Sequence, residues 1–271
     1  MRLPEIDQVT AIIAETAQEL IVPRFGRLEP GAIMEKAPGD LVTIADQESE
    51  VRLTARLPGL LPGSRVVGEE AYAKNPAVLD TLDGDDLVWI VDPVDGTANF
   101  AAGRPRFGTI VALVHRGETL MGWIHMPLDN QTAWAVKGEG AWLDGQRLLL
   151  RQPGPLSTLR GGFNLVKSPP GYAAGVVRLG DAVASRTPVN CAGADYIDAA
   201  AGRVDILSYR KLFPWDHAAG VLLHAEAGGW AAVLDGTRYR PTLRQGPILA
   251  APDEASWQAA RAAMGDMAAA A

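Results

Sequence analysis

Two carboxylates stand three residues apart where an apolar run stops, in the stretch WIVDPVDGTANF of residues 89–100. Asp92 and Asp95 bring two negative charges into a small space, where they repel and one would have to take up a proton. A hard divalent cation removes that conflict, and oxygen ligands on a tight turn, including the Val94 carbonyl, suit Mg²⁺. An Asp-Pro turn followed by an Asp helix cap would give the same pattern without a metal. This stretch alone supports both interpretations equally.

Gly96 and Thr97 follow the two acids. Gly96 permits an unusual turn, and Thr97 stands where a helix could begin, so the Thr97 hydroxyl and the nearby amides could receive a phosphate. Phosphatases of the haloacid dehalogenase type carry an Asp nucleophile in the pattern Asp-x-Asp-x-Thr. Here two residues separate the acids, which changes the face that each acid points to on an extended chain. We therefore do not interpret Asp92 as a phosphorylated nucleophile.

Two further acids stand at predicted helix starts. Thr43 or Asp46 would cap a helix that runs to about Leu57, and Asp46 could also orient a neighbouring hydroxyl. Asp216 lies at the start of a helix predicted over residues 214–226. It is either a plain cap or a ligand aimed from the helix N-terminus.

Glu69 follows a short predicted strand over residues 65–68. If this strand lies beside the predicted strand of residues 87–92, Glu69 and Asp92 would point into one cleft. Taken alone, Glu69 is better described as a solvated surface acid.

The remaining pattern predicts alternating helices and strands. Proline and glycine between residues 151 and 172 indicate a crossing from an N-terminal half, residues 1–150, to a C-terminal half, residues 151–271. From residue 173 onward we expect alternating helical and extended pieces. The predicted elements are a helix over residues 5–22, a loop over 71–86, an antiparallel meander of strands over 107–115, 120–125 and 131–136, a helix over 192–203, strands over 204–207 and 230–234, and an Ala-rich terminal helix.

Composition limits the class of protein. A chain of 271 residues forms one large domain or two closely joined halves. The net charge of -7 and the lack of a Lys/Arg run argue against nucleic acid and anionic membrane as partners. The single cysteine, Cys191, excludes an intramolecular disulfide. Because we find neither a signal peptide nor a long apolar run, we expect a cytoplasmic protein.

Several motifs in order resemble the inositol monophosphatase family. The likeness covers nearly the whole chain, and the combination is far more specific than any one motif. Three motifs are strong: GEE at residues 68–70, WIVDPVDGTANF at 89–100 and PWDHAAG at 214–220. Weaker matches are DLVTIAD at residues 40–46, AVKGEGAWLDG at 135–145 and EAGG at 226–229. The resemblance favours the metal interpretation of the acid pair.

The resemblance implies a fold, a cofactor and roles for individual residues. We expect an α/β (α+β) protein folded as a layered αβαβα sandwich, usually dimeric, in which two or three Mg²⁺ ions bind between the halves of one catalytic unit. The expected metal ligands are Glu69, Asp92, the Val94 carbonyl, Asp95 and Asp216. Thr97, supported by Asp46 and Glu69, would orient and deprotonate a metal-activated water. The expected substrate-binding residues are Asp95, Gly96, Thr97, Lys36 and Tyr209.

Two positions depart from the family pattern. Animal members carry an acid that binds a substrate hydroxyl seven residues before Asp216, where this chain has Tyr209. The segment of residues 190–195, which includes Cys191, also differs from the usual Gly-Ser/Thr. Cys191 is expected to pack or to support the ligands. These departures argue against inositol 1-phosphate as the substrate, but they do not affect the residues expected to hydrolyse a phosphate ester.

These observations give two hypotheses. The first is an enzyme, a lithium-sensitive phosphatase that hydrolyses a small phosphate monoester such as inositol phosphate, histidinol phosphate, a sugar phosphate or 3'-phosphoadenosine 5'-phosphate. The second is a non-catalytic binder of a phosphorylated metabolite. The presence of all five acid and hydroxyl side chains, Glu69, Asp92, Asp95, Thr97 and Asp216, favours the enzyme.

Overall fold

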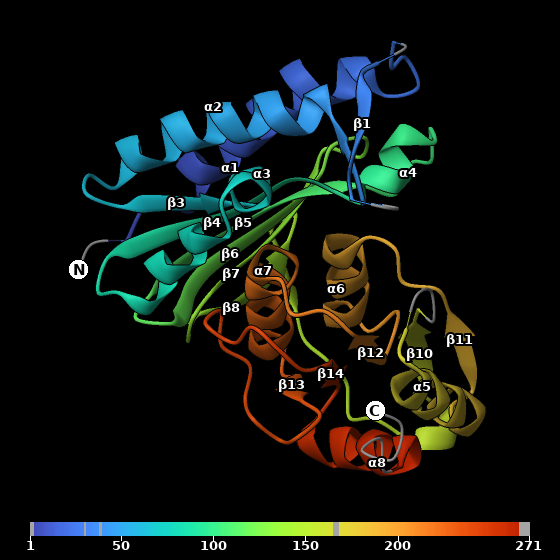
Figure 1. Ribbon diagram of the computed structural model, residues 1–271. Coiled ribbons are helices and arrows are strands. Elements are labelled where there is room, and N and C mark those ends of the chain that lie inside the picture. The colour runs from blue at the N-terminus through green and yellow to red at the C-terminus, as the bar shows by residue number, and fades with distance from the viewer. Residues whose placement is uncertain (1–2, 30, 38–39, 165–167, 266–271) are drawn as a thin grey trace.

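The computed structural model describes residues 3–29, 31–37, 40–164 and 168–265, and it stacks helices and sheets in five alternating layers (Figure 1). A pair of helices covers one face of a seven-stranded sheet, and two more helices separate that sheet from a five-stranded sheet. A last pair of helices closes the other side. The expected αβαβα sandwich is confirmed.

The outer helical layer consists of α1 (Ile6–Thr16) and α2 (Ile44–Leu60). The chain continues from α1 through a π-helical turn, Ala17–Ile21, and a short 3₁₀ helix, Val22–Arg24. The two helices bury Val9, Ile13 and Leu53 against the first sheet. The predicted end of α2 near Leu57 is wrong, because the helix passes through Pro58 to Leu60. A proline in the last turn removes only one helical hydrogen bond, and the Leu61 N–H still donates to the Pro58 carbonyl at 3.1 Å.

Between α2 and the central strand the chain is more ordered than predicted. The segment expected to be a loop over residues 71–86 contains α3 (Glu69–Lys74) and a 3₁₀ helix, Pro76–Asp83. Both are too short to show a helical period in the sequence. A two-stranded hairpin of β1 (Ile33–Ala37) and β2 (Asp40–Thr43) precedes α2.

The seven-stranded sheet carries Asp92 and Asp95 at the C-terminal end of its second strand. The predicted stop of this strand at Asp92 is wrong, because the strand runs on to Asp95 and absorbs Pro93 in a shift of register against its neighbour. Its strands follow the chain in spatial order, and only β3 and β4 are parallel. The predicted meander is confirmed and is extended by two short strands. The strands are β3 (Arg65–Gly68), β4 (Leu87–Asp95), β5 (Gly108–His115), β6 (Glu118–Met126), β7 (Gln131–Val136), β8 (Gly140–Leu143) and β9 (Gln146–Leu148).

The central helical layer is formed by α6 (Ala192–Ala200) and α7 (Pro214–Glu226). The start and end of α7 agree with the prediction, whereas α6 ends three residues earlier than expected. Residues of both helices join one apolar cluster with the inner faces of the two sheets. This packing brings the N-terminal ends of both helices toward the turn after β4.

The five-stranded sheet has the order β11-β10-β12-β14-β13. Its strands are β10 (Arg160–Phe163), β11 (Ser185–Thr187), β12 (Ile206–Tyr209), β13 (Trp230–Val233) and β14 (Ile248–Ala251), with a 3₁₀ turn at Leu156–Thr158 before β10. The helices α5 (Pro170–Ala182) and α8 (Glu254–Met264) cover its outer face. The strand predicted over residues 204–207 lies two residues later. The division of the chain at residue 150 stays a prediction.

No helix in the described part of the chain is both long and apolar enough to cross a lipid bilayer.

Candidate active site

Gly96 fixes the turn that follows β4. Its φ of +81° lies in the left-handed region that glycine adopts without strain. A Cβ atom there would lie 3.0 Å from the Arg106 carbonyl oxygen and 3.3 Å from Cys191 Cβ, so a side chain would not fit. The short helix α4 (Thr97–Ala101) begins directly after this glycine.

Asp92 is a buried acid with one carboxylate oxygen that has no hydrogen-bond partner. The residue is 1% exposed, and its Oδ1 atom has no partner in the structure. Burial, followed by repulsion from Glu69, Asp95 and Asp216, raises the pKa of Asp92 well above its usual range. Buried carboxylate oxygens normally have partners, so this oxygen points to a ligand that a bare protein chain lacks.

Asp95, only three residues later, has the opposite environment. Its Oδ1 accepts a hydrogen bond from the Ala192 N–H at 3.0 Å, and its Oδ2 accepts one from the Gly193 N–H at 2.7 Å. The Cys191 thiol donates to the same Oδ2 at 2.9 Å, which confirms a supporting position for this cysteine. Burial raises the pKa of Asp95, while the Cys191, Gly193 and Ala192 hydrogen bonds lower it. The N-terminus of α6 therefore holds the Asp95 carboxylate in place.

Glu69 lies on α3, directly after β3, and pairs with Lys36 from the β1–β2 hairpin. The Lys36 Nζ atom lies 2.7 Å from Glu69 Oε1 and 3.0 Å from Glu70 Oε1. Burial raises the pKa of Glu69 to about 7, although Lys36 opposes that shift. β3 and β4 are parallel neighbours, which is the condition under which the sequence analysis expected Glu69 and Asp92 to share a cleft. The two carboxylates are close enough for Glu69 to raise the pKa of Asp92.

Thr97 and Asp46 form a hydrogen-bonded pair beside the acids. The Thr97 hydroxyl lies 3.1 Å from Asp46 Oδ1 and 2.9 Å from the Val94 carbonyl oxygen. Asp46 also closes a capping box with Thr43 at the start of α2, so it caps a helix and binds a hydroxyl at once. Burial raises the pKa of Asp46 to about 6, and the Thr43 hydrogen bonds limit the rise. Both predicted functions of Asp46 have the required geometry.

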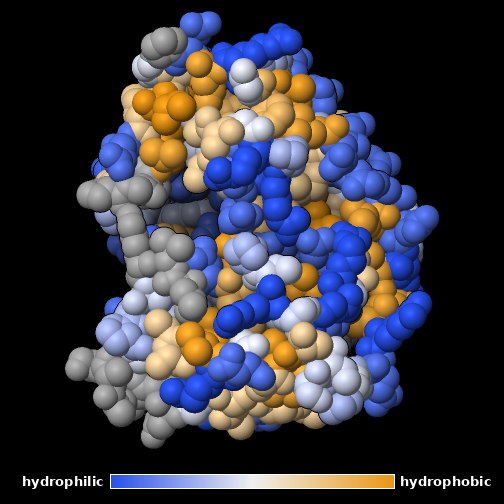
Figure 2. All heavy atoms as spheres, turned by 90° about the vertical axis from the view of Figure 1, so that its right-hand side faces the viewer, coloured by the Kyte–Doolittle hydropathy of each residue, from blue (hydrophilic) through white to orange (hydrophobic). Residues whose placement is uncertain are grey.

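Asp216 lies in the first turn of α7 and faces the same group of acids. Burial, and then repulsion from Glu69 and Asp95, raises its pKa well above the usual range. A cavity of about 370 Å³ opens on Asp216, Glu69 and Lys36. Figure 2 shows the surface hollowed between the upper and lower parts of the molecule, with hydrophilic residues along the border of the hollow.

Tyr209 ends β12 and donates its hydroxyl to Asp195 Oδ2 at 2.6 Å. The Asp195 Oδ1 atom pairs with Arg106 Nη2 at 2.6 Å, and Arg106 also pairs with Asp198 at 2.8 Å. Sequence analysis missed Arg106 and Asp195. The two residues bind each other across 89 residues of sequence, and neither belongs to a motif that could have indicated the contact.

Four acids and the Val94 carbonyl give an all-oxygen donor set, which is the set that Mg²⁺ prefers. Within the described ranges, no three His, Cys, Asp or Glu side chains stand as a ready-made metal group. We attribute this to the pairing of Glu69 with Lys36 and of Asp95 with α6. The unpartnered Asp92 oxygen and the repulsion among the acids remain, and a cation would relieve both. The donor set therefore fits Mg²⁺.

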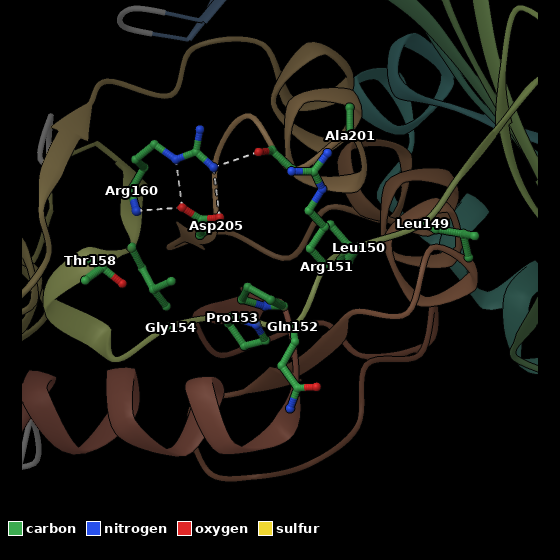
Figure 3. Close-up of a pocket in the computed structure, with 13 residues that line it drawn as sticks. Leu149, Leu150, Arg151, Gln152, Pro153, Gly154, Thr158, Arg160, Ala201 and Asp205 are labelled. Atoms are coloured by element: carbon green, nitrogen blue, oxygen red, sulfur yellow. Dashed lines mark hydrogen bonds and ion pairs between the residues drawn. The ribbon is translucent and has the colours of Figure 1, made fainter.

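A larger cavity of about 570 Å³ lies away from these acids, between the segment of residues 149–154 and the C-terminal end of α6 (Figure 3). In it Arg160 holds Asp205 through two side-chain nitrogens and also donates to the Gly202 carbonyl. None of the predicted site residues lines this cavity. Arg160 and Asp205 already satisfy each other, and no cluster of acids lines this cavity, so size does not make it the candidate active site.

Sequence comparison matches this chain to a family of known proteins. The model of the "Inositol monophosphatase family" matches residues 3–267. The chain is 30% identical over 223 residues to the fructose-1,6-bisphosphatase/inositol-1-monophosphatase of Thermotoga maritima, with 80% of each chain covered. It is 31% identical over 253 residues to the Nus factor SuhB of Pseudomonas aeruginosa, with 88% of each chain covered. It is 33% identical over 218 residues to the inositol-1-monophosphatase of Mesorhizobium japonicum, covering 78% of this chain and 79% of that one.

Solved structures share the fold. An extragenic suppressor protein SuhB from Bartonella henselae superimposes with a TM-score of 0.83 at 25% identity, covering 96% of this chain and 98% of that one. An IMPase of Thermotoga maritima gives a TM-score of 0.82 at 24% identity, covering 97% and 98%.

Proposed function

This chain belongs to the inositol monophosphatase family, and from that premise we propose that it is a Mg²⁺-dependent phosphatase of a small phosphate monoester. One observation carries the proposal. The Asp92 carboxylate is buried without a partner for one oxygen, among acids that repel it, and this arrangement calls for a cation. A phosphate monoester needs the same cation, because its negative charge repels a nucleophile.

The chain supplies a complete set of donors for two or three Mg²⁺ ions: Glu69, Asp92, the Val94 carbonyl, Asp95 and Asp216. When bound, these ions neutralise the phosphate charge and lower the pKa of water. The Asp95 carboxylate is fixed by α6, so one part of the ligand set is oriented before any ion binds. No protein nucleophile is required.

Thr97 and Asp46 would orient the water that attacks the phosphate. The Thr97 hydroxyl has one proton, which it donates either to Asp46 Oδ1 or to the Val94 carbonyl. When Asp46 accepts it, the Thr97 oxygen is free to accept a hydrogen bond from the attacking water and so to orient it. Glu69 assists as a second acceptor in the same cavity.

The substrate would contact residues on both sides of the turn. The amides of Gly96 and Thr97 would cradle the phosphate, and Asp95, Lys36 and Tyr209 would face the substrate. The enzymes among the relatives are named inositol-1-monophosphatase or fructose-1,6-bisphosphatase/inositol-1-monophosphatase. For that reason we keep inositol phosphate, histidinol phosphate, sugar phosphate and 3'-phosphoadenosine 5'-phosphate as candidate substrates. We also propose a cytoplasmic homodimer that Li⁺ inhibits.

The test is a panel of these esters assayed for phosphate release with Mg²⁺ and with EDTA. We expect release from at least one ester that requires Mg²⁺. Relatives named Nus factor SuhB keep the second hypothesis open, a binder without useful catalysis. Saturable, Mg²⁺-dependent binding without release of phosphate would favour that binder and contradict the phosphatase.

A further inference from the structure

The cavity that opens on Glu69 and Asp216 has a second, aromatic wall. This wall is formed by Tyr72, Phe213 and Trp215, and Lys211 lines the cavity beside them. A volume of about 370 Å³ lies in the range of small-molecule sites, roughly 300–1,000 Å³. The cavity therefore has room for more of a substrate than its phosphate group.

The aromatic wall is packed and apolar. The Phe213 and Trp215 rings stack at 4.9 Å between centroids with an interplanar angle of 9°. The Tyr72 ring lies 5.0 Å from Trp215 and 5.8 Å from Phe213, and all three rings pack on the central apolar cluster. A polyol, with hydroxyls on every side, would lose hydrogen bonds against this wall, whereas a flat ring would gain apolar contact.

Lys211 places a cation at the rim of this wall. Its ammonium lies over the Phe213 ring, 5.1 Å from the ring centroid. Its charge acts on the Asp216 carboxylate of the same cavity and lowers the pKa of that acid, but Lys211 forms no ion pair in the part of the chain that the structure describes. Its main chain is held, because the His217 ring nitrogen Nε2 lies 2.8 Å from the Lys211 carbonyl oxygen. Lys36, the other lysine of the cavity, already contacts two carboxylates. An anion entering the cavity would therefore meet the Lys211 ammonium without first breaking an ion pair.

We propose that the alcohol portion of the substrate bears a flat ring and a second anionic group. The ring packs against Tyr72, Phe213 and Trp215, and Lys211 binds the second anion. This inference rests on the proposed phosphatase function and narrows its substrate to ring-bearing alcohols with two anionic groups.

The experiment uses four esters that separate these features. 3'-Phosphoadenosine 5'-phosphate and adenosine 3'-phosphate differ only in the second anion. Inositol 1-phosphate and glycerol 2-phosphate lack the flat ring. With Mg²⁺, we expect the KM to be lowest for the bisphosphorylated nucleotide, about tenfold higher for adenosine 3'-phosphate, and higher again for the other two esters. A tenfold ratio corresponds to about 1.4 kcal/mol.

Two matched sets of variants assign the effect to residues. Lys211→Gln should raise the KM for the bisphosphorylated nucleotide about tenfold, change the KM for adenosine 3'-phosphate less than twofold, and leave kcat unchanged. Arg210→Gln removes a neighbouring positive charge that does not line the cavity, and should change neither KM. Tyr72→Ala should raise the KM for both adenosine esters but not for glycerol 2-phosphate, and Tyr72→Phe should restore it.

The outcomes separate the two proposals. If none of the four esters releases phosphate but histidinol phosphate or a sugar phosphate does, this inference is overturned while the phosphatase stands. If no ester of the whole panel releases phosphate, the proposed function fails, and this inference fails with it. If esters are hydrolysed but Lys211→Gln affects both adenosine esters alike, or neither, the role of Lys211 is overturned while the phosphatase stands. A lower KM for inositol 1-phosphate than for the adenosine esters would overturn the aromatic subsite.

Discussion

Asp92 and Asp95 lie three residues apart on β4 and are both buried, but their hydrogen bonding differs. The Asp92 carboxylate has an oxygen without a partner, whereas Asp95 receives two amide hydrogen bonds and one from a thiol. Asp92 lies on β4 of the first sheet, and the partners of Asp95 lie on the central helix α6. The protein supplies hydrogen bonds to both oxygens of Asp95, whereas one oxygen of Asp92 receives none from the protein.

The hydrogen bonding of Asp95 contributes to the stability of the protein, whereas the unpartnered oxygen of Asp92 is explained by a role in its chemistry. A buried charge that the chain leaves unpaired lowers stability, so its presence is explained by function. A buried charge with three donors contributes to stability and also fixes the geometry of its neighbour. The two acids should therefore respond differently to the same chemical change.

The largest effect is expected for Asp92→Asn. Removing this charge should reduce Mg²⁺-dependent phosphate release at least about 10³-fold, as the loss of a central charged group does in other active sites. Stability in EDTA should stay the same or rise, because an unpaired buried charge is removed. Phosphate release and urea unfolding measure the two quantities. A loss of stability, or retained turnover, would count against the role of Asp92.

Asp95→Asn should combine both kinds of damage. The amide NH₂ of asparagine would face the N–H groups of Ala192 and Gly193, and so at least one buried donor would lose its acceptor. We expect phosphate release to fall about 10²-fold. The free energy of unfolding should fall by about 2 kcal/mol. Equal stability of Asp92→Asn and Asp95→Asn in urea would remove the contrast drawn here.

A smaller effect is expected at Asp195, which lies one turn behind the residues that hold Asp95. Asp195 binds Arg106 and the Tyr209 hydroxyl, while Asp198 binds Arg106 and Arg203 but not Tyr209. Asp195→Asn should weaken the hydrogen bonds that fix the start of α6 by about 1 kcal/mol. Because the amides at the start of α6 hold Asp95, the Mg²⁺ concentration for half-maximal activity should rise about fivefold. Asp198→Asn is the matched control and should change it less than twofold. Similar shifts in both variants would mean that Arg106 alone carries the effect.

His224 is a third buried titratable residue, and burial favours its uncharged form. Its ring is buried, its Nδ1 atom has no partner, and burial lowers its pKa from 6.5 to about 4. The unfolded chain therefore binds a proton more readily, so the contribution of His224 is complete above pH 6.5 and is lost as the pH falls toward 4. Between these limits the wild type should lose about 1.4 kcal/mol per pH unit more than His224→Gln. Urea unfolding at pH 7.0 and 5.5 measures this, and parallel losses in the two proteins would refute it.

Sequence patterns predicted the elements whose signals are local. Pro214 and the glycines after Glu226 delimit α7, and the run ending at Asp92 marks β4, because each signal lies within a few residues of its effect. The helix α3 was missed because it is short. The helix α5 lies where alternating helical and extended pieces were expected, but the glycines and prolines around its start hid its bounds.

The candidate site was predicted through its acids and not through their supports. The proximity of Glu69 to Asp92 follows from two neighbouring strands, and the contact of Asp46 with Thr97 follows from a capping acid near a helix start. The contact of Cys191 with Asp95, and that of Asp195 with Arg106, joins segments about ninety residues apart or more. Such contacts depend on the packing of whole layers, which no local pattern encodes.

The hold of α6 on Asp95 has a consequence for the order of folding. The amides of Ala192 and Gly193 lie 97 and 98 residues along the chain from the carboxylate that they bind. Closing so long a loop is slow compared with forming a hairpin or a helix. During refolding from urea, circular dichroism should therefore recover before catalysis does, since the last contacts to form are those that aim this carboxylate.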